Sequence, residues 1–243
     1  QCLSLVLRLG TPNSTKKLSN NMIYIFGGDH CDEKLYKRLI RLFGEIKPDL
    51  ICIEELTHDD KVIKACNDLI GGKISLDKFK KLTGFEEYWF KFAPYKELFS
   101  YLQKNKIKIY PIDHKLKERI KLIKFEKKIL EEIKKGKNIS DLKEKEEKIS
   151  VFDREKEMVV NINKGIKKFK SKNICVIIGG NHTDRVGDVL VKIGYKVSKK
   201  NISNIEETER YLNRMYKYAV SNKVAAMKIP PLVPIFVEVF RKI

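Results

Sequence analysis

Two short motifs place histidines where they could do chemistry. Residues 27–32 read Gly-Gly-Asp-His-Cys-Asp, and residues 179–184 read Gly-Gly-Asn-His-Thr-Asp. Each motif follows an apolar segment and precedes a segment with helical spacing. Glycine permits a sharp turn and a close approach of the backbone. The repeat therefore predicts that His30 and His182 occupy equivalent strand-to-helix turns.

Acidic residues close two further apolar segments. Glu54 and Glu55 follow residues 50–53, and Asp113 follows residues 107–112. In an α/β sheet, ligands bind beyond the carboxyl ends of the strands. Because successive strand residues face opposite sides, we expect at most one of the two glutamates to point at such a site. Two imidazoles with one or two carboxylates suit a divalent metal such as Zn, Mn, Fe or Co, and without a metal they could act as general acid and base.

Neighbouring polar residues have simpler interpretations. Asp32 and Asp184 could simply cap the helices that follow the two motifs, which is the commoner role of aspartate there. His58 has no comparable context, so we expect it at the surface or as a local cap. His114 could be structural or functional, and Cys31 is not favoured as a nucleophile.

The hydrophobic pattern predicts an α/β fold with a mixed or mostly parallel central sheet flanked by helices, including two strand–Gly-Gly-x-His–helix units. Segment 22–53 is long enough for a parallel strand–helix–strand crossover. The predicted strands are 1–9, 22–26, 50–53, 107–112, 173–178 and 195–198. The predicted helices are 33–46, most of 58–105, and 184–193.

We expect residues 1–243 to form a single domain with two additions. Residues 115–158 are amphipathic and highly charged with a break at 136–140, a pattern typical of two helices in a projecting hairpin. Residues 205–243 form a helical tail with an apolar end, which could dock on the body or make a homo-oligomer contact. The aromatic residues between 89 and 95 are expected in the core or in a lid.

The charge of the chain is strongly positive. Lys and Arg number 51 against 32 Asp and Glu, a formal net charge of +19, and 42 of the 51 are Lys. Nucleic-acid surfaces rely on Arg for bidentate contacts and on interleaved aromatic residues for stacking. Here the lysines are spread along helical segments with Glu and Ile, as on solvated faces. We therefore do not expect nucleic acid as a partner.

The cysteines and the hydropathy of the chain predict the cellular compartment of the protein. The five cysteines include no Cys-x-x-Cys pair, and Cys52 and Cys175 lie in apolar segments, so we expect buried thiols in a reducing cytoplasm. A membrane-spanning helix needs about 18 consecutive apolar residues, which the chain lacks, so no span is expected. The N-terminal apolar segment has no basic residues before it, and no secretory signal is expected.

An ordered set of four motifs carries a resemblance to a known family. The chain resembles the TraB/PrgY family, within the wider group that includes the Tiki-type metalloproteases and the erythromycin esterase-like and ChaN-like folds. The resemblance covers roughly residues 20–200. Its motifs here are Gly27-Gly-Asp-His30, Lys47-Pro-Asp-Leu-Ile-Cys-Ile-Glu54, Asp153-Arg-Glu-Lys-Glu-Met158 and Gly179-Gly-Asn-His182.

The resemblance implies roles for the motif residues. His30 and His182 would be the paired site histidines, Glu54 the site carboxylate, and Arg154 a cation that orients a carboxylate or stabilises an oxyanion. Asp113 matches the family's third acidic strand end more loosely. The chain departs from the usual first motif, Gly-Thr-Ala-His-Val-Ser, by adding aspartates, which favours a hard cation such as Mn or indicates a changed substrate.

The leading hypothesis is a metal-dependent hydrolase that acts on a peptide or amide bond. His30, His182 and Glu54 would bind Mn, Co or Zn, and Glu55 or Asp113 would transfer protons. One alternative is a non-catalytic protein that sequesters a peptide or small anionic ligand, since some family members look like binding proteins. A second alternative is a nucleic-acid binder that uses the Lys-rich segment 115–172.

Overall fold

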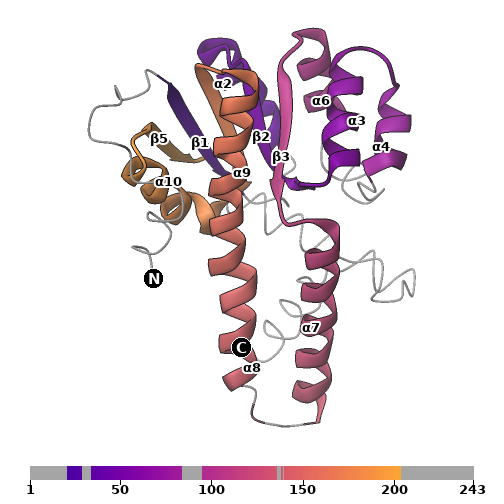
Figure 1. The fold of residues 1–243 in the computed structure, drawn as a ribbon, viewed down its shortest axis with the longest axis vertical. Coiled ribbons are helices and arrows are strands. Elements are labelled where there is room, and N and C mark those ends of the chain that lie inside the picture. The colour runs from indigo at the N-terminus through magenta and orange to yellow at the C-terminus, as the bar shows by residue number, and fades with distance from the viewer. Residues whose placement is uncertain (1–20, 29–33, 84–94, 136–137, 139, 204–243) are drawn as a thin grey trace.

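The computed structural model describes residues 21–28, 34–83, 95–135, 138 and 140–203 (Figure 1). The predicted strand at 1–9, the first-motif histidine His30, the aromatic residues at 89–92 and the tail at 205–243 lie outside the described residues.

Five strands form one sheet in which every neighbouring pair is parallel. The strands are β1 (Met22–Gly28), β2 (Leu50–Thr57), β3 (Lys108–Asp113), β4 (Asn173–Gly179) and β5 (Lys196–Asn201), in the order β3-β2-β4-β1-β5. Helices flank this sheet on both faces, so the predicted α/β fold class is confirmed. The inner strands β2 and β4 are almost continuously apolar and buried, as expected for strands covered on both faces.

Two hydrophobic cores lie on opposite faces of the sheet. The first packs the sheet against four helices: α2 (Leu35–Ile46), α3 (Asp60–Ile70), α4 (Leu76–Thr83) and α6 (Tyr95–Lys104). The second packs it chiefly against α9 (Arg154–Phe169) and α10 (Thr183–Lys192). Cys52 and Cys175 are fully buried in these cores, as their apolar context predicts.

Strand order brings the two glycine pairs together. Strand β4 lies between β1 and β2, so the predicted crossover from β1 to β2 is parallel but passes over β4. In the β1–β4 register Gly28 lies opposite Gly179, and the two Gly-Gly turns end neighbouring strands. The helices after β1 and β2 pack in the first core and the helix after β4 in the second, so the end of β4 is a topological switch point, where α/β proteins bind ligands.

The charged insertion forms a helical hairpin that projects beyond the carboxyl ends of the strands (Figure 1). It consists of α7 (Leu116–Lys134), α8 (Ser140–Glu147) and the π-helical segment η1 (Lys148–Asp153), which leads directly into α9. The second helix of this hairpin was expected to end near residue 158. It instead continues through α9 to residue 169, because α9 also crosses over from β3 to β4 and packs on the sheet. Within the described ranges, no helix is both long and apolar enough to cross a membrane.

The end of β1 leaves no room for a larger residue at Gly27. A Cβ atom there would overlap Thr183 Oγ1 and lie 3.2 Å from the Gly180 Cα atom. We expect Gly27→Ala to lower the free energy of unfolding by about 1–3 kcal/mol through overpacking. Gly44→Ala is the control: its Cβ meets nothing within 4 Å, and alanine should stabilise α2 by about 0.5–1 kcal/mol. Urea denaturation of both variants tests this, and equal effects would contradict it.

Candidate functional site

A single guanidinium group joins the ends of two strands. Arg154, the first residue of α9, donates to both oxygens of Asp113, over 2.6 Å from Nε and 3.1 Å from Nη2. Its Nη2 also lies 2.7 Å from Glu54 Oε1. Burial disfavours the charged guanidinium, but the charges of Glu54 and Asp113 outweigh this effect and raise the pKa of Arg154. Both carboxylates are almost fully buried, so the arginine compensates charges that water does not reach.

An irregularity in β2 positions Glu54. The β2–β3 register runs evenly to Ile53 opposite Pro111 and resumes at Thr57 opposite Asp113. Three residues of β2 therefore bulge against one residue of β3, a device often found beside functional sites. Beyond Ile53 the Glu54 carboxylate accepts a hydrogen bond from the Gly179 backbone N–H, so a side chain continues the contact between β2 and β4.

The orientation of His182 is set by Glu155. His182 ends the single 3-10 turn η2 (Gly180–His182) after β4, and its Nδ1 lies 2.7 Å from Glu155 Oε1. Arg185 also donates to Glu155, from Nε over 2.9 Å. Burial raises the pKa of Glu155, but the hydrogen bonds from His182 and Arg185 outweigh burial and lower it. Glu155 is therefore a carboxylate, and His182 donates to it from Nδ1, which leaves Nε2 as the ring nitrogen on the side of Glu54.

The other ring nitrogen of His182 faces Glu54. His182 Nε2 lies 3.7 Å from Glu54 Oε1. Two ligands each about 2.1 Å from a tetrahedrally coordinated ion lie about 3.4 Å apart, so this pair is spaced as ligands of one cation would be. Within the described part of the chain, no group of three or more His, Cys, Asp and Glu residues could hold a metal ion. The described residues therefore provide two potential donors, and His30 lies outside them.

Glu55 belongs to the other face of the sheet. Its Oε1 accepts hydrogen bonds from the hydroxyls of Tyr36, over 3.0 Å, and Tyr95, over 2.9 Å. Burial and the negative charge of Glu55 raise the pKa of both tyrosines, so both remain hydrogen-bond donors. Alternation along β2 thus directs Glu54 to α9 and Glu55 to α2 and α6.

The two remaining described histidines flank the site. His58 was expected at the surface or as a local cap, and this was wrong: it is buried, with Nδ1 2.9 Å from the distant Pro111 carbonyl oxygen and its ring against Tyr110. His114 Nδ1 lies 2.5 Å from Glu157 Oε2.

The structure thus brings together four of the six predicted site residues: Glu54, Asp113, Arg154 and His182. Glu55 lies apart from them, and a proton-transfer role for Glu55 or Asp113 stays a prediction. Asp184 makes no helix cap and instead lies 3.1 Å from Lys199 Nζ.

Sequence reasoning missed two carboxylates on α9. Glu155 and Glu157 orient His182 and His114. Both lie within three residues of Arg154 in the first turn of α9, close to the same edge of the sheet. Their closeness in sequence to the motif arginine was the one sign in the sequence that they could lie at the site.

No family model, curated protein or solved structure matches this chain.

Arg154 should be essential to the stability of this end of the molecule. We expect Arg154→Met to lower the free energy of unfolding by about 3–5 kcal/mol at pH 7, because it leaves two buried carboxylates uncompensated. Adding Glu54→Gln and Asp113→Asn should restore a large part of the loss. Lys156→Met on the same helix removes an exposed charge, and its effect should stay within about 0.5 kcal/mol. A similar loss in both single variants, measured by urea denaturation, would contradict this account.

The His114–Glu157 pair predicts a pH-dependent contribution to stability. Burial lowers the pKa of His114, but its hydrogen bond to Glu157 and the nearby carboxylate charges outweigh burial and raise this pKa above 6.5. The same hydrogen bond lowers the pKa of Glu157 below 4.5, against burial. The histidine contribution is complete below pH 6.5 and is lost as pH rises through the folded pKa of His114. The glutamate contribution is present above pH 4.5 and is lost as pH falls through the folded pKa of Glu157.

Glu157→Gln should therefore cost about 1 kcal/mol of unfolding free energy at pH 6 and clearly less at pH 9. Glu118→Gln, which removes an exposed ion-pair partner of Lys121, is the control and should be nearly neutral at both values. Urea denaturation at the two pH values measures the difference. A loss for Glu157→Gln that does not change with pH would show that the pair is not ionised as described.

Proposed function

We propose that this protein is a metal-dependent hydrolase of a peptide or amide bond, with its centre at the carboxyl ends of β2 and β4. The observation that carries the proposal is the pairing of His182 Nε2 with Glu54 Oε1 at 3.7 Å. An imidazole nitrogen and a carboxylate oxygen at this spacing, both on buried residues, are donors that one bound cation can share.

The surroundings of this pair support a divalent ion. Metal-binding histidines commonly donate their second ring N–H to a carboxylate, as His182 does to Glu155. The carboxylates Glu54, Asp113 and Glu155 gather here around the guanidinium groups of Arg154 and Arg185. His182 and Glu54 would hold the ion, with His30 as the predicted third ligand, and Mn, Co and Zn are the candidates. A bound ion would supply an activated water or a polarised carbonyl.

The protein's own groups have distinct roles in this proposal. Asp113 holds Arg154 through two hydrogen bonds, so the direction of the guanidinium is fixed. Among the described residues, Arg154 Nη1 has no hydrogen-bond partner, and it would donate to the oxyanion that develops on a substrate carbonyl. Glu155 accepts a hydrogen bond from His182 Nδ1 and thereby directs Nε2 toward Glu54.

A second candidate is a non-catalytic protein that binds a peptide or small anionic ligand at the same site. Arg185 favours it, because about half of its side chain is exposed beside the buried network. An anionic group could approach Arg185 and Arg154 Nη1 without any metal. Peptide turnover separates the two candidates.

The test measures metal content and metal-dependent stabilisation of the full chain incubated with Mn, Co or Zn. We expect about one ion per chain and a rise in Tm, both lost in His182→Ala, in His30→Ala and in Glu54→Gln. Glu155→Gln should weaken binding about 10–100-fold, since it removes the group that orients the ligand. His58→Gln, outside the site, is the control. No bound ion in the unmodified protein, or binding that survives His182→Ala, would overturn the metal assignment.

Turnover is tested with a library of unstructured peptides and the metal-loaded protein. Cleavage that is lost in Arg154→Gln while the metal content is kept would support the hydrolase. Saturable peptide binding without cleavage, weakened in Arg154→Gln, would instead favour the second candidate.

A further inference from the structure

Three lysines adopt a backbone conformation that usually belongs to glycine. Lys47, Lys106 and Lys170 have φ values of 51°, 55° and 52°, and no other described non-glycine residue has a positive φ. Each lies where a helix ends and the chain turns into a strand, at the start of β2, β3 and β4 respectively. Glycine or asparagine is the usual residue in such turns, because a Cβ atom makes the left-handed conformation unfavourable. A lysine therefore occupies this unfavourable backbone conformation at three turns along one edge of the sheet.

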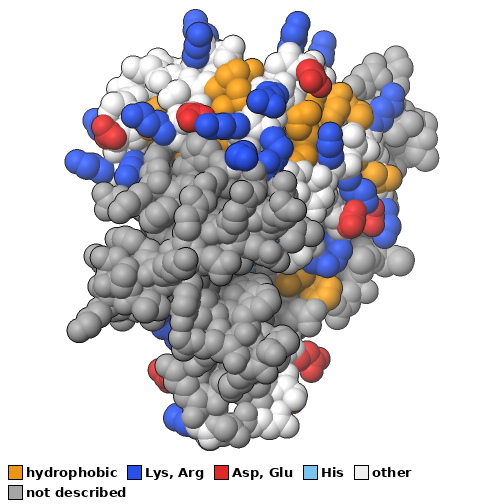
Figure 2. Space-filling view, turned by 180° about the vertical axis from the view of Figure 1, so that it is seen from behind, with side chains coloured by type: hydrophobic (Ala, Val, Ile, Leu, Met, Phe, Trp, Pro, Cys, Tyr) orange, Lys and Arg blue, Asp and Glu red, His pale blue; other side chains and the backbone are white. Residues whose placement is uncertain are grey.

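Further lysines share this edge, which we call the lysine edge. It comprises the four helix-to-strand turns that enter β2, β3, β4 and β5, from the last turn of each helix to the first strand residues. In these turns Glu45 and Asp49 are the acidic residues among the described ones. The lysines are Lys47, Lys104, Lys106, Lys108, Lys167, Lys168, Lys170, Lys172, Lys192 and Lys196, and all ten are exposed. Figure 2 shows Lys and Arg side chains gathered at the upper end of the molecule, where the strands of Figure 1 begin.

Three lysines of the helical hairpin have described acidic partners, whereas the edge lysines have none. In the hairpin Lys117 and Lys121 contact Glu118, and Lys135 contacts Glu132. None of the ten edge lysines forms an ion pair with a described carboxylate. Unpaired charges of one sign in close array repel one another, so an anionic partner would relieve that repulsion.

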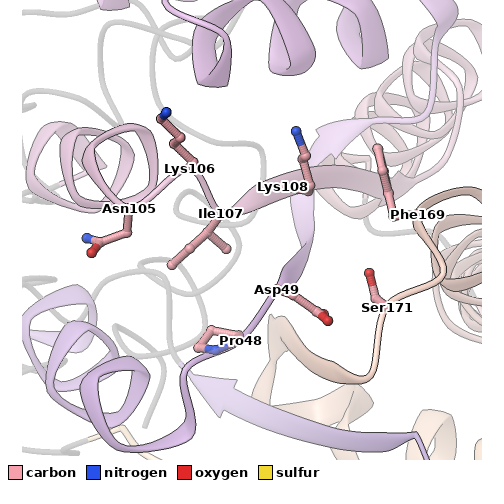
Figure 3. Close-up of a pocket in the computed structure, with 8 residues that line it drawn as sticks. All are labelled: Pro48, Asp49, Asn105, Lys106, Ile107, Lys108, Phe169 and Ser171. Carbon is pink, nitrogen blue, oxygen red and sulfur yellow. The ribbon is translucent and has the colours of Figure 1, made fainter.

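A pocket of about 350 Å³ opens within the lysine edge (Figure 3). Lys106 and Lys108 line it together with the ring of Phe169, and Asp49, Asn105 and Ser171 add a carboxylate, an amide and a hydroxyl. This volume is near the lower end of the range for small-molecule sites and suits a single ring system. A half-buried aromatic ring beside hydrogen-bonding groups and lysines matches a nucleobase attached to a phosphate backbone.

We propose that the lysine edge binds single-stranded nucleic acid without sequence preference, with phosphates over the lysines and one base against Phe169 in the pocket. A membrane surface is less suitable, because peripheral membrane binding also needs exposed apolar side chains. Among the described residues, the exposed large apolar side chains lie on α4, α7 and η1, apart from Val191 near the end of α10. Lysine without arginine fits contacts that read charge and not base identity.

This proposal is independent of the hydrolase proposal. Asp49, at the pocket, precedes Glu54, at the candidate site, by five residues of mostly extended chain, which is about 17 Å. It also revises the expectation that nucleic acid is not a partner. That expectation rested on lysines spread along the sequence, whereas ten of them meet at one edge.

The test measures fluorescence anisotropy of a labelled oligothymidylate of about 20 nucleotides with the full chain over a series of salt concentrations. We expect the affinity to fall steeply with salt. The variant Lys106→Gln/Lys108→Gln/Lys170→Gln should lower the salt slope by about 2, since each phosphate contact on a single strand contributes about 0.7. The control Lys117→Gln/Lys121→Gln/Lys135→Gln removes the same charge from the hairpin and should change the slope little. Equal losses in the two variants would overturn the proposal.

Two further measurements separate binding from folding and from membrane attraction. Lys47→Gly/Lys106→Gly/Lys170→Gly should raise Tm, because glycine tolerates the left-handed turns, while it weakens oligonucleotide binding. Phe169→Leu should weaken binding about tenfold through lost stacking. Unchanged affinity in the glycine variant would overturn the proposal. Sedimentation with phosphatidylserine-containing vesicles, together with no oligonucleotide binding, would also overturn it and assign the edge to membranes.

Discussion

The guanidinium group of Arg154 binds two buried carboxylates that come from different strands, and the rest of the candidate site depends on this contact. It ties the ends of β2 and β3 to the start of α9. The next residue on the helix, Glu155, then meets the imidazole of His182 at the end of β4. Adjacent residues of one helix therefore hold both halves of the site. A buried charge without a partner is strongly unfavourable, so the network is kept whole or lost as a unit.

Strand topology explains why these groups meet. The chain returns from β3 through α9 to place β4 between β1 and β2, so the end of β4 lies beside both the Gly27-Gly28 end of β1 and Glu54. The helix after β4, α10, packs on one face of the sheet, whereas the helices after β1 and β2 pack on the opposite face. The end of β4 is therefore the topological switch point of the sheet. Gly27 matters for the same reason, since Thr183 of the next turn occupies the space beside it.

The strands and the main helices were predictable because β-branched runs and helical spacing are local properties of the chain. The site carboxylate Glu54 could be predicted from its place after such a run. Glu155 could not, because an acidic residue in a charged helix looks solvent-exposed until the side of the helix that packs on the sheet is known. His58 was misjudged since its partner is the carbonyl oxygen of Pro111, 53 residues away. The bulge after Ile53 likewise depends on how β3 pairs with β2.

The net charge of +19 gains meaning once its distribution is known. Among the described residues, carboxylates outnumber guanidinium groups at the carboxyl ends of the strands, whereas lysines dominate the opposite edge. The strand length between them, about 17 Å, is roughly twice the Debye length of about 8 Å at physiological salt. Through solvent, each end is therefore largely screened from the charges of the other. The proposed cation site and the proposed nucleic-acid surface can therefore coexist in this fold without either field cancelling the other.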